Sequence, residues 1–286
     1  MNPGVTILLL VTLVWGTTFP LLKSASADLG GVEISAFRFL VAAVCMAPFL
    51  RNVPRRAWTD GALLGVLALA SYVSQAYGLQ FISSNRSAFL TSLNVLMVPL
   101  IGLAFGGRVT WTIFASGALA CFGIGLMSWE GGGNLAGDAA TVVCALAYAL
   151  YVIVLSRCSA RHDASHLAAT QIVVMAVLGT VWMLTQSPDV LATLPSRAQI
   201  HWMTLVYLGA VATAGMLFLQ AVGQRRVTAD KAALIFAMEP VFAAVFGWLW
   251  LDEVLGWRGI AGGAVVLGAL ILSEMRASSA KSEPAA

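Results

Sequence analysis

Charged residues are scarce in this chain, since Asp, Glu, Lys and Arg make up only 10% of its 286 residues. A soluble domain carries about 25% charged residues, which keep its surface in water. Hydrophobic residues account for 59% of the sequence, and the mean hydropathy is +0.87. This composition excludes a soluble globular protein and predicts an integral membrane protein whose surroundings are the lipid bilayer.

Residues that bind metals or nucleic acids are also few. His162 and His166 have the four-residue spacing of a zinc-binding pair on a helix, but neither a glutamate base nor a third ligand accompanies them. The four cysteines lie in apolar runs or at the end of one, so we interpret them as small packing residues. No basic face with interleaved aromatic residues suggests nucleic acid. We therefore expect no metal, no cofactor and no nucleic-acid partner.

Ten apolar runs follow one another along the chain, and each is long enough to cross a hydrocarbon core of about 30 Å. They cover residues 4–23, 32–50, 58–81, 85–106, 110–129, 136–156, 164–186, 200–222, 229–251 and 257–275. The sequence therefore predicts an all-α integral membrane protein with ten transmembrane helices. Residues 277–286 are expected to form a disordered cytoplasmic tail.

Lys and Arg are distributed unevenly over the links between these runs. With the N-terminus inside, most fall on the cytoplasmic side, among them Arg51, Arg55, Arg56, Arg225 and Arg226. The opposite side holds Lys23, Arg86, Arg197 and Arg258. Because cytoplasmic loops carry an excess of basic residues, this bias predicts that both termini are cytoplasmic.

The two halves of the chain repeat one another. Residues 82–108 align with residues 227–253 without gaps, and this alignment pairs Asn94 with Glu239. Weaker matches pair Trp15 with Tyr148 and Arg38 with Gln171. Since each half has five spans, an odd number, the second half must enter the membrane from the opposite side, as in the inverted repeats of secondary transporters. The expected domains are two five-helix repeats at 1–130 and 131–276.

Glu239 lies near the middle of the ninth run and is followed at once by Pro240. Charging a carboxylate in hydrocarbon is costly, so an ionisable side chain at that depth normally faces a cavity or a partner. Proline lacks a backbone N–H and frees a carbonyl one turn earlier. Glu239 is therefore the strongest candidate site residue. As a functional group, it either binds and releases a proton that is coupled to transport or faces a substrate ammonium group. The structural alternative is a protonated acid that forms a hydrogen bond to a neighbouring helix.

Other polar and aromatic residues within the runs are candidates for the wall of a central cavity. Residues three, four or seven apart share a helix face, as do Tyr148 and Tyr151. The candidate substrate-binding residues are Trp15, Thr18, Tyr72, Gln75, Leu79, Asn94, Tyr148, Tyr151, Thr213, Gln220 and Glu239. Core packing or interhelical hydrogen bonding is the alternative interpretation for these side chains. Arg38 is interpreted either as a structural cation or as a group that attracts a substrate carboxylate.

Three motifs occur in a fixed order along the chain. The first run contains Leu-Val-Trp-Gly-Thr-Thr-Phe-Pro-Leu-Leu-Lys at residues 13–23, and the second contains Arg38. The strongest motif begins at Met238-Glu239-Pro240-Val241, continues through Asp252-Glu253 and ends in a glycine-rich last run. In this order the motifs resemble the EamA-type branch of the drug/metabolite transporter superfamily. The resemblance implies a ten-helix exporter or facilitator of small metabolites, typically amino acids, in the bacterial inner membrane.

Three functions remain open after this resemblance. Amino-acid exporters, including exporters of aromatic amino acids, belong to the group. Aromatic walls with few fixed charges also favour a zwitterionic, amphipathic solute over a phosphate ester, which would need paired Lys or Arg. A proton-coupled multidrug antiporter that uses Glu239 is the alternative. An intramembrane enzyme is a remote alternative, because no nucleophile with a base, metal set or paired acids is present. The expected assembly is a monomer or a homodimer.

Overall fold

The computed structural model describes residues 2–25, 28–78, 81–82, 87, 90–104, 110–128, 134–186, 199–251 and 256–282. In this part of the chain every regular element is a helix. The first half contains α1 (Pro3–Ala25), α2 (Gly31–Met46), the 3-10 helix η1 (Ala47–Leu50), α3 (Arg55–Gly78), α5 (Asn94–Ala104) and α6 (Trp111–Ser128). The second half contains α7 (Leu135–Cys158), α8 (Ala164–Gln186), α10 (Trp202–Val206), the π-helix η2 (Tyr207–Gly215), α11 (Met216–Gln224), α12 (Ala229–Phe236), α13 (Glu239–Leu251) and α14 (Trp257–Ser282).

Seven helical segments of the described residues are long and apolar enough to cross a membrane. They are Pro3–Leu22, Gly31–Leu50, Arg55–Gly78, Leu135–Cys158, Ala164–Thr185, Trp202–Gln224 and Ala229–Trp250. Shorter apolar helices at Leu90–Ala104, Trp111–Leu126 and Trp257–Leu272 lie where the other predicted runs fall. The all-helical membrane fold is thus confirmed, whereas ten complete spans remain a prediction. Helix α14 also extends over residues 277–282 of the predicted tail.

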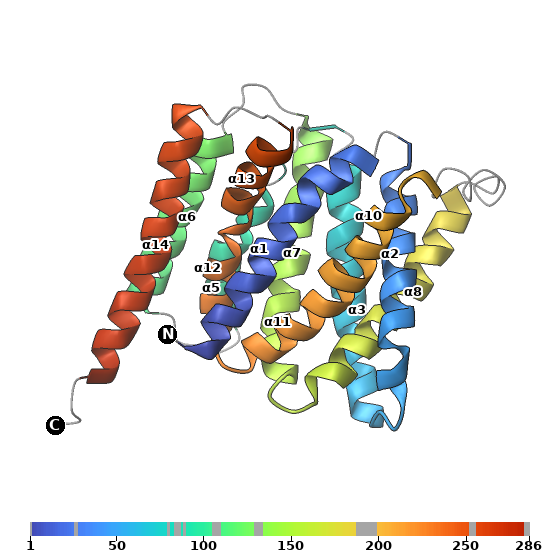
Figure 1. The fold of residues 1–286 in the computed structure, drawn as a ribbon. Coiled ribbons are helices and arrows are strands. Elements are labelled where there is room, and N and C mark those ends of the chain that lie inside the picture. Colours follow the sequence, from blue (N-terminus) through green and yellow to red (C-terminus); the bar gives the residue numbers. More distant parts are fainter. Residues whose placement is uncertain are drawn as a thin grey trace.

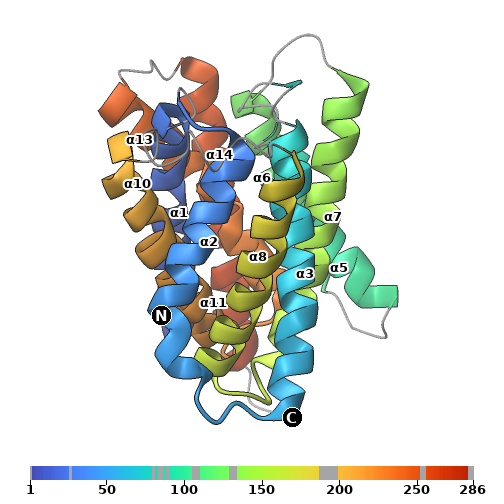
Figure 2. The ribbon, with the colours of Figure 1, turned by 90° about the vertical axis from the view of Figure 1, so that its right-hand side faces the viewer.

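The helices form one bundle with α6 and α14 at one edge and α2 and α8 toward the other (Figures 1 and 2). Helix α3 packs against α7 and α8, and α1 packs against α11 and α13. The π-helix η2 packs on α2. The surface of the bundle is apolar, with Val44, Phe122 and Trp248 more than half exposed, as expected for side chains that face lipid.

The ninth run is interrupted immediately before its proline. Helix α12 ends at Phe236, Ala237 and Met238 form a turn, and α13 begins at Glu239. Helix α5 likewise begins at Asn94, directly after a turn at Leu93. The interruption lies beside Pro240, whose missing backbone N–H favours it, and a second interruption lies at the residue that the sequence aligns with Glu239.

Candidate functional site

Arg38 of α2 is buried and reaches across to the second half of the chain. Its Nε donates a hydrogen bond to Oγ1 of Thr213 in η2, at 2.9 Å. Its guanidinium carbon lies 5.1 Å from the ring centre of Tyr72 in α3, which adds a cation–π attraction. A hydroxyl and an aromatic face therefore hold this cation in the interior of the bundle.

The π-helix η2 positions the acceptor of that hydrogen bond. Thr213 Oγ1 also donates to the carbonyl of Leu208, five residues earlier, at 2.7 Å. A π-helix turn contains one extra residue compared with an α-helix turn, and such turns are frequent at functional sites. Apolar periodicity does not reveal this change of pitch, so the sequence did not predict it.

Glu239 begins α13 beside the interruption in the ninth run. Its side chain is partly buried. The carboxyl group lies near enough to Arg38 of α2, Tyr72 of α3 and Tyr148 of α7 for electrostatic interaction with each of them. Because these partners belong to other helices of the bundle, the carboxyl group points into the bundle.

Aromatic rings gather beside Glu239. The ring centres of Trp15 and Phe236 are 5.6 Å apart, and those of Phe236 and Tyr148 are 6.0 Å apart. Tyr148 stacks on Tyr151 with ring centres 5.8 Å apart. The indole N–H of Trp15 donates to the carbonyl of Ala212 at 2.9 Å. Helices α1, α7 and α12 thus contribute one aromatic wall, and the sequence predicted all of its members except Phe236.

A chain of buried amides continues from this wall. Tyr151 donates to Oε1 of Gln171 at 3.0 Å, and Gln220 donates to Oε1 of Gln224 at 3.0 Å. Gln224 in turn donates to Oγ of Ser156 at 2.8 Å. Among the described residues Nε2 of Gln171 is buried without a hydrogen-bond partner. The sequence missed Gln224 because the predicted eighth run stopped at residue 222, whereas α11 continues to Gln224.

The remaining candidates serve more local roles. Gln75 donates to Oγ1 of Thr91 at 3.4 Å, and Asn94 donates to the carbonyl of Thr91 at 2.9 Å. Thr18 donates to the carbonyl of Trp15, one turn earlier in its own helix. Asn94 thus satisfies the interrupted backbone beside it. Leu79 lies outside the described residues.

Seven of the predicted residues are connected by these contacts and charges: Trp15, Tyr72, Tyr148, Tyr151, Thr213, Gln220 and Glu239. The fold and this polar and aromatic interior define a multi-pass helical membrane protein whose polar groups face inward. The chain matches the EamA-like transporter family over residues 2–129 and 135–275. It belongs to that family, and it is therefore a membrane transporter of small molecules.

Relatives agree with this membership, and a solved structure has the same fold. The chain is 27% identical to an uncharacterized transporter of Archaeoglobus fulgidus, over 94% of this chain and 85% of that protein. It is 26% identical to a probable terminal-alkyne amino-acid exporter of Streptantibioticus cattleyicolor, over 96% of this chain and 95% of the exporter. One crystal structure matches with a TM-score of 0.79 at 16% identity, covering 97% of this chain and 99% of its own. At that identity the likeness shows the fold alone.

Proposed function

We propose that this protein is a secondary transporter that exports amphipathic metabolites, above all amino acids with large neutral or aromatic side chains. The observation that carries the proposal is a buried cation and a partly buried carboxyl group that lie near enough for electrostatic interaction, beside a wall of aromatic rings. The cation is Arg38 and the carboxyl group belongs to Glu239. A relative named as a probable amino-acid exporter supports the same substrate class.

Each part of an amino acid has a partner of matching chemistry in this site. The terminal nitrogens of Arg38 would bind the substrate carboxylate, since a guanidinium matches a carboxylate in geometry and charge. Glu239 would bind the ammonium group. Trp15, Tyr148 and Phe236 would contact an apolar side chain. Among the described residues Arg38 is the one buried Lys or Arg, which favours one carboxylate over a phosphate ester that would need several cations.

We propose that the two halves are inverted repeats and that their relative rocking exposes the site to each side in turn. Glycine contacts support this arrangement. A Cβ on Gly65 would lie 2.7 Å from the carbonyl oxygen of Gln171, and one on Gly209 would lie 2.8 Å from that of Arg38. Arg38 and Gln171 are residues that the sequence alignment pairs. The family match in two segments, 2–129 and 135–275, agrees with a boundary near residue 130.

The proposed topology has ten spans, with both termini on the cytoplasmic side of a bacterial inner membrane. The apolar helices at Leu90–Ala104, Trp111–Leu126 and Trp257–Leu272 support the three spans that are shorter. Arg55 and Arg56 are exposed at the start of α3, where the predicted cytoplasmic link ends. This orientation follows the excess of basic residues in cytoplasmic loops.

A proton-coupled multidrug antiporter is the second candidate. Glu239 supports it, because ionisable residues within membrane spans commonly form proton relays in pumps and transporters. The two candidates differ in their dependence on a pH gradient. Amino-acid facilitation would proceed without one, whereas drug antiport would require it.

Efflux of radiolabelled phenylalanine from proteoliposomes tests the proposal. We expect purified protein to speed efflux over empty liposomes, with unlabelled large neutral amino acids competing and sugar phosphates failing to compete. Efflux that needs a pH gradient would favour coupling through Glu239. Absence of movement for every amino acid would reject this substrate class and favour the drug antiporter.

A further inference from the structure

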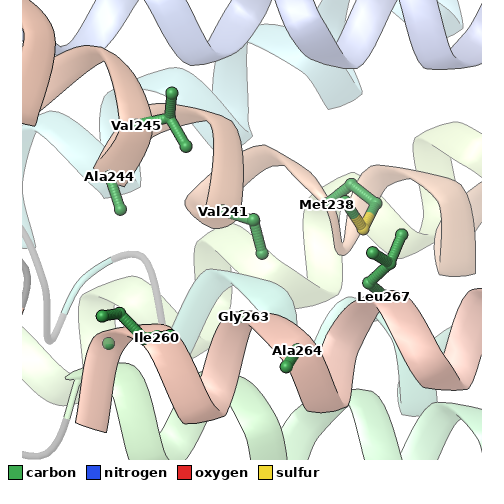
Figure 3. Close-up of a pocket in the computed structure, with 9 residues that line it drawn as sticks. Met238, Val241, Ala244, Val245, Ile260, Gly263, Ala264 and Leu267 are labelled. Atoms are coloured by element: carbon green, nitrogen blue, oxygen red, sulfur yellow. The ribbon is translucent and has the colours of Figure 1, made fainter. Parts of the chain in front are cut away.

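An apolar groove lies between α13 and the first half of α14 (Figure 3). It encloses about 260 Å³, and its walls are apolar throughout. Val241 of α13 and Leu267 of α14 point into the space between the two helices (Figure 3). Val245, Ile260 and Leu267 are each more than a third exposed. The groove therefore lies on the outer surface of the bundle, where the chain meets lipid.

The groove exists because both helices make their closest contacts elsewhere. Helix α14 packs on α6, where a Cβ on Gly123 would lie 2.7 Å from the carbonyl oxygen of Gly262. Across the groove the approach is looser, since a Cβ on Gly263 would lie 3.6 Å from Cγ1 of Val241. Glycine on a membrane helix normally permits close helix contact, but here Val241 leaves room for a methyl group beside Gly263.

The dimensions and chemistry of the groove match one lipid chain. Its residues on α14 extend from Gly259 to Leu267, which corresponds to about 12 Å at a rise of 1.5 Å per residue. One leaflet contributes about half of the ~30 Å hydrocarbon core. Apolar cavities stay dry and accept apolar ligands. An acyl chain of one leaflet therefore fits the groove in length and in polarity.

The helix turn at which the groove begins also carries a cation. Arg258 directly precedes Gly259, and its guanidinium carbon lies 5.6 Å from the ring centre of Trp257. Both side chains are exposed. Tryptophan is enriched at the membrane–water interface, and a guanidinium binds phosphate oxygens well. The apolar groove and the adjacent Arg258 thus complement the two parts of a phospholipid.

We propose that the groove binds one phospholipid, with an acyl chain between α13 and α14 and an anionic headgroup on Arg258. The bound chain would supply the packing that α13 and α14 lack between themselves. This lipid site is separate from the interior that holds Arg38 and Glu239, so it goes beyond the proposed transport function.

Native mass spectrometry with added phosphatidylglycerol tests the lipid site. We expect one phosphatidylglycerol molecule to stay on the wild-type protein. Gly263→Leu fills the groove and should lower this retention at least tenfold. Gly268→Leu is the matched control, because a side chain at Gly268 of the same helix meets nothing within 4 Å. Equal retention by the two variants, or a wild-type protein without lipid, would overturn the proposal.

A second pair of variants tests the headgroup contact. Arg258→Gln should reduce the preference for phosphatidylglycerol over phosphatidylcholine at least threefold, while Arg56→Gln at the exposed start of α3 should leave it unchanged. An unchanged preference in Arg258→Gln would overturn the headgroup assignment even if Gly263→Leu fails to fold. A dimer that forms through this groove without lipid would also overturn the proposal, in favour of a second copy of the chain.

Discussion

The rings of Trp15 and Tyr148 meet across the two halves of the chain, with their centres 6.5 Å apart. The sequence alignment of the halves pairs these same two residues. A residue and its symmetry counterpart can touch only near the axis that relates them, so this contact would lie on the axis of the proposed repeat. Glu239 interacts electrostatically with Tyr148. The candidate substrate site would thus lie where the two halves move relative to each other.

Removing the indole of Trp15 tests the aromatic wall. Trp15→Ala loses the contacts with Tyr148 and Phe236 and the hydrogen bond to Ala212. We expect the free energy of unfolding to fall by roughly 3–5 kcal/mol, as for other buried tryptophans. Efflux competition should show that phenylalanine loses more affinity than alanine. Trp111→Ala is the control, because Trp111 is 76% exposed; it should change neither the free energy of unfolding nor the two affinities. If Trp15→Ala lowers the affinities for phenylalanine and alanine equally, Trp15 does not belong to the wall that contacts the substrate side chain.

The hydrogen bond between Arg38 and Thr213 provides a second test. Thr213→Val keeps the shape of the side chain but removes the oxygen that accepts from Arg38 Nε. We expect a loss of about 1–2 kcal/mol in the free energy of unfolding, and a higher KM for amino-acid efflux because the guanidinium is held less firmly. Thr12→Val is the control, since Thr12 is buried but bonds only to Leu8 of its own helix among the described contacts. A KM that rises equally in both variants would contradict a specific role of Thr213.

The helices were predictable because membrane spans depend on long apolar runs, and each described span lies on one of them. Glu239 could be selected as a candidate from the same runs, since a carboxyl group in such a run is rare; its role stays a prediction. The π-helix η2, by contrast, changes the pitch within a uniformly apolar run, which leaves no pattern in the sequence. Phe236 was missed because a phenylalanine inside an apolar run does not differ from one that faces lipid; only the ring contacts with Trp15 and Tyr148 distinguish it.

Replacing Glu239 with glutamine separates the two candidate functions. Glu239→Gln keeps the size of the side chain but removes its charge and its titratable proton. If Glu239 binds the substrate ammonium, amino-acid efflux should continue with KM raised about tenfold, which corresponds to about 1.4 kcal/mol. Asp230→Asn in α12 is the matched control and should leave KM unchanged. An unaltered KM together with loss of gradient-driven drug exchange would instead support the antiporter.

The glycine contacts of α3 and η2 allow a direct test of the repeat. A Cβ on Gly65 or Gly209 would come within 2.8 Å of a backbone carbonyl oxygen of the facing helix, closer than packed atoms tolerate, so each helix pair would have to separate. We expect Gly65→Ala and Gly209→Ala each to cost about 1–3 kcal/mol in the free energy of unfolding. Gly268→Ala, where a side chain meets nothing within 4 Å, should not lower the melting temperature in detergent. Gly65 and Gly209 approach Gln171 and Arg38, which the alignment of the halves pairs, so the proposed repeat predicts similar losses. A large loss in one variant and none in the other would show that the two contacts are not related by symmetry.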